Sequence, residues 1–105
     1  MNNNQNTFGI SPKSYTLLIE ALLKSSVDKA IIFGSRAIGN EKKGSDIDLA
    51  VWGSKLSVDL LNNLKSQVNE HCNIPYFVDI IDYKTISNLQ LKEHIDEFGK
   101  IIFQR

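Results

Sequence analysis

The sequence predicts one domain of mixed α/β (α+β) class, in which helices flank a mixed β-sheet in the order α-β-β-α-β-α-β. Three observations support this prediction. The 105-residue chain is long enough for one hydrophobic core but too short for two. Some segments have apolar residues at helical spacing, and others are short runs rich in β-formers. The connection between the first two runs is too short for a parallel crossover, so those strands should be antiparallel.

The first helix is predicted from about Pro12 to Ser25. Ser11 is a favourable N-cap, and proline is favourable at the first helical position. The apolar side chains that recur at helical spacing are Tyr15, Leu18, Leu22 and Leu23. Residues 1–10 are rich in asparagine and have no apolar period. We therefore expect a mobile polar tail there, followed by a single domain over residues 11–105.

Two strands are predicted on either side of a polar connection. The apolar run Val27–Phe33 is typical of a buried strand, and Asp46–Trp52 is the second strand. Between them, we expect a short helix over Ser35–Ile38 and a loop over Asn40–Ser45.

The second half of the chain continues the alternation of helices and strands. Ser57 can cap a helix whose apolar stripe follows it. Tyr76–Ile81 is predicted to be the third strand. The segment Ile86–Phe98 has helical spacing, with a possible break near Asn88, and Ile101–Phe103 is a final short strand.

Composition narrows the classes of function. The formal net charge is zero, so nothing in the overall charge favours binding to DNA, RNA or an anionic membrane. No apolar segment approaches membrane-spanning length. The single cysteine excludes an internal disulfide and a multi-cysteine zinc site. These features are typical of a cytoplasmic protein that binds neither DNA nor a membrane.

Two carboxylates lie close together in the second predicted strand. Side chains alternate along a strand, so Asp46 and Asp48 share one face. Such a pair costs Coulomb energy unless a positive group lies between them, and Mg²⁺ prefers carboxylate and phosphate oxygens. Gly34 and Ser35 precede the pair in a turn that lets phosphate oxygens approach the backbone. A solvated strand face is the competing interpretation of the two acids.

A third carboxylate is expected on a neighbouring strand. Asp79 and Asp82 are the candidates, and strand periodicity places them on opposite faces, so only one of them can join the pair. Asp79 lies inside the predicted strand, where an unpaired charge is costly. Asp82 lies at its end, where it can cap the next segment or face water.

These motifs resemble the signature of the nucleotidyltransferase superfamily that includes DNA polymerase β. The family pattern is Gly-Ser, ten residues, then Asp-x-Asp, and here Gly34-Ser35 is followed by Arg36 to Ser45 and then Asp46-Ile47-Asp48. The residues around the two motifs, Gly-Ser-Arg-Ala and Ser-Asp-Ile-Asp-Leu-Ala-Val, are most similar to the sequences of the minimal nucleotidyltransferases. Many of those proteins are antitoxin partners of HEPN-domain toxins. The resemblance covers nearly the whole chain and implies a palm-like core.

The resemblance also implies roles for individual residues. Asp46 and Asp48 would hold two Mg²⁺ ions (Mn²⁺ could replace them). Asp79 matches the third acid, which is a further metal residue and helps to activate the attacking hydroxyl. Gly34 and Ser35 would hold the outer phosphates. Arg36 is either a phosphate ligand or a solvated helix residue, and the sequence leaves both open.

The implied reaction transfers a nucleoside monophosphate, AMP from ATP or another nucleoside triphosphate, to a hydroxyl. The implied acceptor is a tyrosine of a HEPN-type toxin, which the chain would neutralise as an antitoxin within a hetero-oligomer or a homo-oligomer. Two other hypotheses stay open. One is a module that neutralises its partner by contact alone, and the other is transfer to a small molecule such as an aminoglycoside.

The remaining reactive side chains have ordinary interpretations. His71 and His94 lack a partner at ligand spacing and are expected at the surface. Cys72 has no evident base beside it and is expected to pack. Trp52 and Tyr83 can stack on a base, but a place in the core or an interface is the default expectation.

Overall fold

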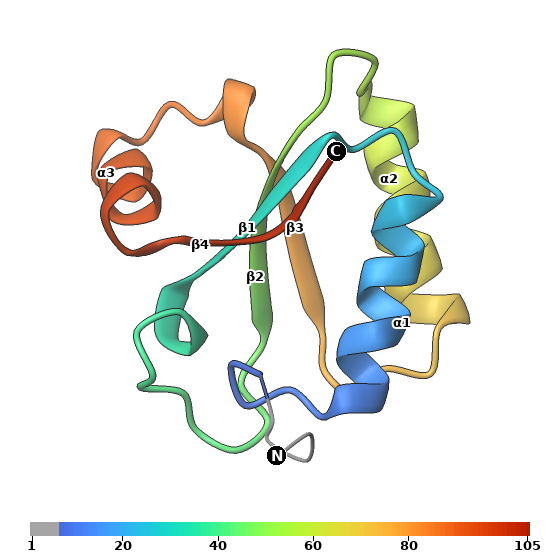
Figure 1. The fold of residues 1–105 in the computed structure, drawn as a ribbon. Helices are drawn as coiled ribbons and strands as arrows, with labels where there is room; N and C mark the ends of the chain where they lie inside the picture. Colours follow the sequence, from blue (N-terminus) through green and yellow to red (C-terminus); the bar gives the residue numbers. More distant parts are fainter. Residues whose placement is uncertain (1–6) are drawn as a thin grey trace.

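The computed structural model describes residues 7–105 and has a four-stranded sheet with helices on both faces (Figure 1). The elements are α1 (Pro12–Leu23), β1 (Lys29–Phe33), β2 (Ile47–Trp52), α2 (Val58–Ser66), β3 (Val78–Asp82), α3 (Leu89–Phe98) and β4 (Lys100–Gln104). Single turns of 3-10 helix follow β1 and β3, and a π-helical turn extends α2. The predicted fold class and element order are confirmed.

The strands lie in the order β3-β2-β1-β4. Strand β1 is antiparallel to both β2 and β4, whereas β2 and β3 are parallel. The antiparallel pairing of the first two strands is confirmed, because their short connection permits only a hairpin-like return. Helix α2 supplies the longer crossover that the parallel pair needs. The start of β2 and the start of β3 therefore lie side by side at one end of the sheet.

Helices α1 and α2 cover one face of the sheet, and α3 covers the other (Figure 1). The larger core lies under α1 and α2, where Ile47, Leu49 and Val51 of β2 are fully buried. A smaller cluster lies under α3 and includes Ala50 of β2. Alternate residues of β2 thus face different layers, and Asp48 lies on the α3 side.

The predicted helix starts are confirmed by their caps. The Ser11 hydroxyl accepts a hydrogen bond from the Ser14 amide at 3.2 Å, and Ser57 accepts one from the Leu60 amide at 3.2 Å. Asn88 caps α3 through its side-chain oxygen, which fits the predicted break before that helix.

The mobile tail predicted over residues 1–10 can be compared with the structure only at residues 7–10. Residues 1–6 lie outside the described part of the chain. Thr7 and Ile10 form a β-bridge, and the Ile10 side chain is fully buried in the main core. For residues 7–10 the expectation is therefore wrong, because Ile10 buries enough apolar surface to fix this segment on the domain.

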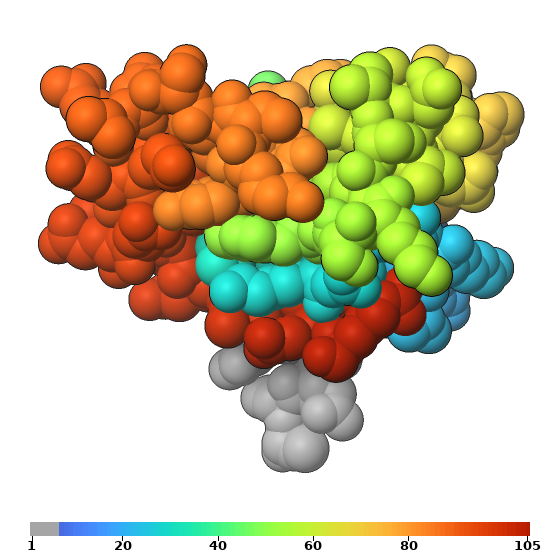
Figure 2. Space-filling view, turned by 90° about the horizontal axis from the view of Figure 1, so that it is seen from above, coloured from blue at the N-terminus to red at the C-terminus, as the bar shows by residue number. Residues whose placement is uncertain are grey.

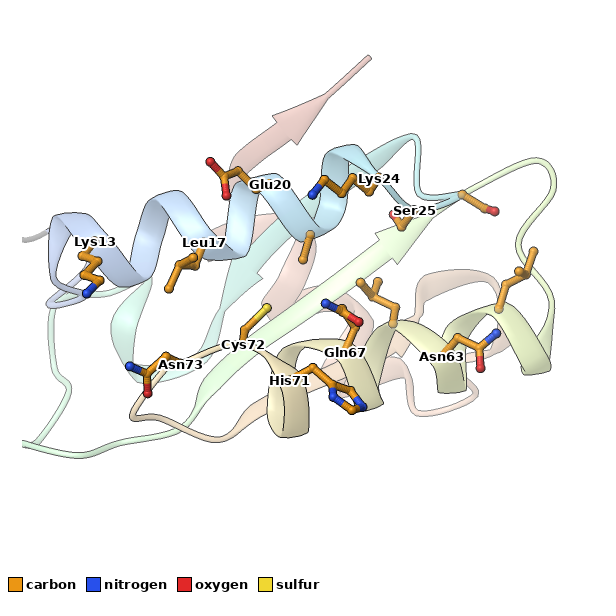
Figure 3. Close-up of a pocket in the computed structure, with 14 residues that line it drawn as sticks. Lys13, Leu17, Glu20, Lys24, Ser25, Asn63, Gln67, His71, Cys72 and Asn73 are labelled. Atoms are coloured by element: carbon orange, nitrogen blue, oxygen red, sulfur yellow. The ribbon is translucent and has the colours of Figure 1, made fainter.

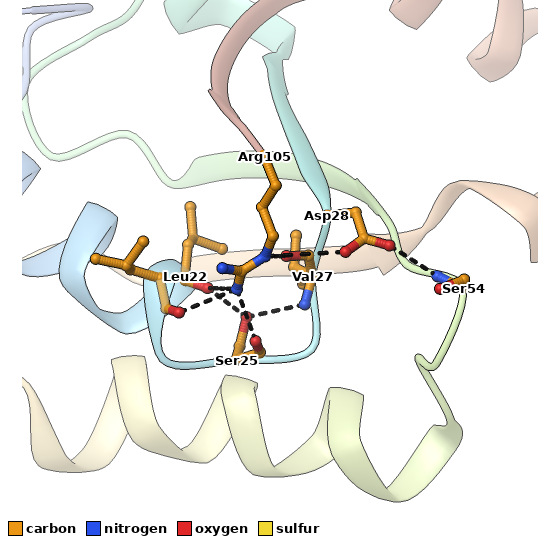
Figure 4. A network of polar contacts seen from close by, with 7 residues as sticks. Leu22, Ser25, Val27, Asp28, Ser54 and Arg105 are labelled. Carbon is orange, nitrogen blue, oxygen red and sulfur yellow. Dashed lines mark hydrogen bonds and ion pairs between the residues drawn. The ribbon is translucent and has the colours of Figure 1, made fainter.

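The C-terminal end of α1 is held by the side chain of Arg105, which follows β4. Arg105 donates hydrogen bonds to the carbonyls of Leu22, Leu23, Ser25 and Val27, and its Nε lies 3.8 Å from an Asp28 carboxylate oxygen (Figure 4). Helix carbonyls at a C-terminus lack partners within the helix, so a guanidinium stabilises them. Figure 2 views this end of the molecule, where the start of β1 and the end of β4 lie side by side.

Within residues 7–105, no helix has the length and apolar character needed to span a membrane.

Candidate active site

Three carboxylates meet where the starts of β2 and β3 lie side by side. Asp46 immediately precedes β2, and Asp48 is the second residue of that strand. Asp79 is the register partner of Asp48 across the parallel β2–β3 pair. Asp82 pairs instead with Val51 at the far end of β3, and its carboxylate accepts a hydrogen bond from the backbone amide of the following turn. The structure therefore brings Asp79, and not Asp82, to the Asp46 and Asp48 pair.

The site raises the pKa of Asp48. Partial burial is the largest cause, and the negative charges of Asp79 and Asp46 add to it. Arg36 acts in the opposite direction, as does His94 whenever its ring is protonated, but the pKa remains above its ordinary value. Negative charge at Asp48 is thus unfavourable in the protein alone, and a cation between these carboxylates would relieve that cost.

Gly34 packs closely against the Asp48 carboxylate. Phe33, the residue before it, is the register partner of Asp48 across the β1–β2 pair. Gly34 has a φ of +78°, and a Cβ atom at this position would lie 2.6 Å from the Asp48 Oδ2 atom. Only glycine fits, both for its backbone conformation and for lack of space. The Gly34-Ser35 turn and the carboxylates therefore form one continuous surface.

Ser35 lies in the single 3-10 turn Gly34–Arg36, where a helix over Ser35–Ile38 was expected. The turn ends early because the chain bends back, and the Ser35 carbonyl accepts a hydrogen bond from the Asn40 amide at 2.8 Å. Ser35 is half-buried beside Gly34.

Arg36 has a role that neither sequence interpretation contained. The side chain is 3% exposed, so of the two alternatives the solvated helix residue is excluded. Its Nη2 donates to the Ser45 carbonyl at 2.6 Å, its Nε to the Asp46 carbonyl at 3.3 Å, and its Nη1 to the Phe8 carbonyl at 2.9 Å. The guanidinium also lies 4.6 Å from the centre of the Tyr76 ring. Arg36 therefore holds the loop that carries Asp46, and its donors are directed at backbone carbonyls.

His94 was expected at the surface, and that expectation is wrong. It is half-buried in α3, and its Nε2 accepts a hydrogen bond from the Gly34 amide at 3.0 Å. Its ring packs between Phe33, in a T-shaped contact with centroids 6.2 Å apart, and Phe98, at 5.4 Å. The helical spacing of Leu91, Ile95 and Phe98 could have placed His94 near the inner face of α3. The local sequence could not have identified its partner.

The other candidates lie away from the carboxylates. His71 is exposed, and Cys72 packs half-buried against the main core, as expected. Trp52 and Tyr83 stack on each other with ring centroids 4.5 Å apart, at the far end of β2. Lys29 lies over the Trp52 ring, so this pair is occupied by contacts within the protein.

A pocket with a volume of about 780 Å³ lies in the groove between α1 and α2 (Figure 3). It lies on the opposite face of the sheet from the carboxylates. Its lining mixes charges and amides of both helices, including Lys13, Glu20 and Asn63. A large volume alone does not make an active site, and we place the chemistry at the carboxylates because reactive groups converge there.

The carboxylates provide the kind of donors that Mg²⁺ binds. Within residues 7–105, no set of three or more acidic, histidine or cysteine side chains converges as a complete ion cage. A Mg²⁺ site needs fewer protein ligands than a complete cage, because the ion commonly binds one or two carboxylates together with substrate phosphates. The raised pKa of Asp48 beside Asp46 and Asp79 fits such a partly formed site.

Comparison with known families now settles the class of protein. The family model described as "Polymerase beta, Nucleotidyltransferase" matches residues 18–105. The chain belongs to this nucleotidyltransferase family. Nucleotidyl transfer is accordingly its class of activity. No curated protein matches the chain significantly.

Solved structures of toxin–antitoxin complexes share the fold of this nucleotidyltransferase. A toxin–antitoxin complex with AMP-PNP aligns with a TM-score of 0.69 and 21% identity over 87% of this chain and 73% of that chain. The MntA–HepT complex aligns at 0.63 and 19% identity over 89% and 72%. A tri-AMPylated Shewanella oneidensis HEPN toxin in complex with its MNT antitoxin aligns at 0.64 and 19% identity over 89% and 71%. At these identities the comparison establishes the shared fold.

Proposed function

We propose that this nucleotidyltransferase moves AMP from ATP to a hydroxyl of a HEPN-type toxin and thereby acts as its antitoxin. The observation that carries the proposal is the placement of Asp46, Asp48 and Asp79 around the Gly34 turn. Family membership supports the reaction class. The AMPylated HEPN toxin in a complex of the same fold supports the choice of acceptor.

Each residue has a defined task in the proposed reaction. Asp46 and Asp48 would hold two Mg²⁺ ions, or Mn²⁺, together with the phosphates of ATP. Bound there, the ions would neutralise charge on the transferring group and orient the attacking oxygen. Gly34 and Ser35 would hold the outer phosphates. The acceptor oxygen bonds to the α-phosphorus, the bond to pyrophosphate breaks, and Asp79, exposed at the edge strand, receives the hydroxyl proton.

Asp79 and Asp82 provide a matched pair of variants for testing the site. We expect Asp79→Asn to lower the transfer rate on purified partner by about 10²-fold or more, a typical loss for a general base. Asp82→Asn should keep most activity, because that carboxylate lies at the other end of β3 and caps a turn. The reverse ranking, with both variants folded, would exclude Asp79 as the third acid.

The decisive experiment separates catalysis from neutralisation by contact. Incubation with the partner, ATP and Mg²⁺ should add adenylyl mass to the partner in intact-protein mass spectrometry. The Asp46→Asn, Asp48→Asn double variant should fold but transfer nothing, because the anionic ligands are gone. Cells expressing it with the toxin should then lose protection. Full protection by the double variant, with no mass added by the wild type, would refute transfer and favour a binding module.

A further inference from the structure

His94 links α3 to the turn that faces the carboxylates. Gly34 donates its amide hydrogen to the His94 Nε2 across 60 positions of sequence, at 3.0 Å. The acceptor nitrogen must be unprotonated, so the ring hydrogen of the neutral imidazole is on Nδ1. The Phe33 and Phe98 rings pack against the imidazole, with centroids 6.2 and 5.4 Å from its own, and limit its rotation. The imidazole is therefore fixed as an acceptor at this position.

The bonded amide belongs to a residue that packs closely on one of the carboxylates. Gly34 has a positive φ, and its α-carbon has no room for a side chain beside the Asp48 carboxylate. Glycine adopts this conformation without strain but is also free to adopt many others, so contacts with neighbouring groups must fix its position. On one side Gly34 continues from Phe33 in β1, and on the other it begins the 3-10 turn. The hydrogen bond to His94 adds the third restraint, from a different layer of the molecule.

We propose that His94 is a positioning residue that sets the Gly34-Ser35 turn for the phosphates of the nucleotide. This inference rests on the proposed function, because it concerns the same site. With the Gly34 amide held by α3, the direction of the turn is fixed and Ser35 is presented on its open side. Without the acceptor, the Gly34 amide is left unpaired in a half-buried place, and the turn shifts to find another partner.

Two substitutions separate this role from simple packing. His94→Leu keeps an apolar body between Phe33 and Phe98 but removes the acceptor. His94→Gln can place an acceptor oxygen near the position of Nε2. His71→Leu is the control, because that histidine is exposed near the end of the π-helical turn, on the other face of the sheet. Thermal unfolding of all three variants checks that they fold.

The main measurement is steady-state transfer to the partner with varied Mg·ATP. We expect His94→Leu to raise KM about tenfold, the size of one lost hydrogen bond to a positioned group, with a smaller change in kcat. His94→Gln should recover most of the loss, and His71→Leu should match the wild type. Equal KM values for His94→Leu and the wild type would overturn the proposal. So would equal losses in the Leu and Gln variants.

A second measurement does not depend on transfer. Calorimetry with Mg²⁺ and an ATP analogue that carries a methylene bridge between its α- and β-phosphates should show the same ranking of affinities. Nitrogen NMR of the nucleotide-free protein should show His94 Nε2 as an unprotonated, hydrogen-bonded nitrogen. If the wild type binds the analogue but transfers nothing, the proposed function fails, and the ranking of affinities still decides the role of His94. If the wild type does not bind the analogue, both fail.

Discussion

Replacing Gly34 by alanine tests whether the turn and the carboxylates act as one unit. The added Cβ atom would lie 2.6 Å from the Asp48 Oδ2 atom, a distance at which one of the two must move. The left-handed backbone adds a cost of about 1–2 kcal/mol for any residue with a side chain. Displacing well-packed neighbours typically adds about 1–3 kcal/mol. We therefore expect Gly34→Ala to lower the free energy of unfolding by about 2–5 kcal/mol.

Gly44→Ala is the matched control for this experiment. Gly44 has nearly the same backbone conformation, with a φ of +80° against +78° for Gly34. Nothing lies within 4 Å of a Cβ atom built there. This variant should therefore carry only the backbone cost of about 1–2 kcal/mol. The difference between the two variants isolates the collision with Asp48.

Two assays should respond differently in the two variants. Thermal unfolding of a domain of this size shifts by about 4–8 °C per kcal/mol, so the larger loss in Gly34→Ala is measurable. Transfer at a temperature where both variants are folded should fall about 10²-fold in Gly34→Ala, because small displacements of reacting groups cost that much. Gly44→Ala should stay close to the wild type. Equal stability and equal transfer in the two variants would refute the close packing of Gly34 on Asp48.

Three further predictions follow from single contacts, each measured by urea unfolding. In metal-free protein, Asp48→Asn should be more stable than wild type at neutral pH. The native state binds the Asp48 proton more tightly than the unfolded state, so this advantage should vanish as pH falls through the raised pKa. Arg36→Met should cost about 3 kcal/mol or more, because partly buried carbonyls, including that of Asp46, lose a charged donor, and Arg36→Lys should not restore the forked geometry. Asn69→Ala should cost about 1–2 kcal/mol, because the Val78 amide and carbonyl both lose their partner. A loss below about 0.5 kcal/mol, as at ordinary surface positions, would contradict the last two predictions.

Much of the fold follows from local features of the sequence. Caps at Ser11 and Ser57, apolar spacing and a short first connection determine the elements and the antiparallel pairing of β1 with β2. The alternation of side chains along a strand is also sufficient to separate Asp79 from Asp82. These inferences succeed because each depends on residues close together in the chain.

The failures concern partners that are distant in the chain. Nothing near His94 indicates that it meets the Gly34 amide 60 residues away. The residues around Arg36 do not indicate that its donors reach the Phe8 carbonyl and the loop before β2. The polar composition of the N-terminal segment gives no indication that Ile10 is buried in the core. Periodicity indicates which face is buried, but it does not identify what that face meets.

The site itself combines unfavourable charge with strong restraint of the backbone. Three carboxylates repel one another, and this repulsion contributes to the raised pKa of Asp48. Left alone, such a cluster would spread apart. The Asp46 carbonyl is held by the Arg36 guanidinium, and the residue before Asp79 is held at both its amide and its carbonyl by Asn69.

Asp48 is restrained in a different way, through its neighbour in the sheet. It pairs with Phe33, and the next residue, Gly34, is held by His94 of α3. Side chains from the first loop, the π-helical turn and the last helix thus fix the backbone at or beside the three acids. The three carboxylates therefore stay close together although their negative charges repel one another. A divalent cation bound with a triphosphate would stabilise this arrangement. On this argument, loosening any one restraint should weaken metal-dependent nucleotide binding more than it weakens folding.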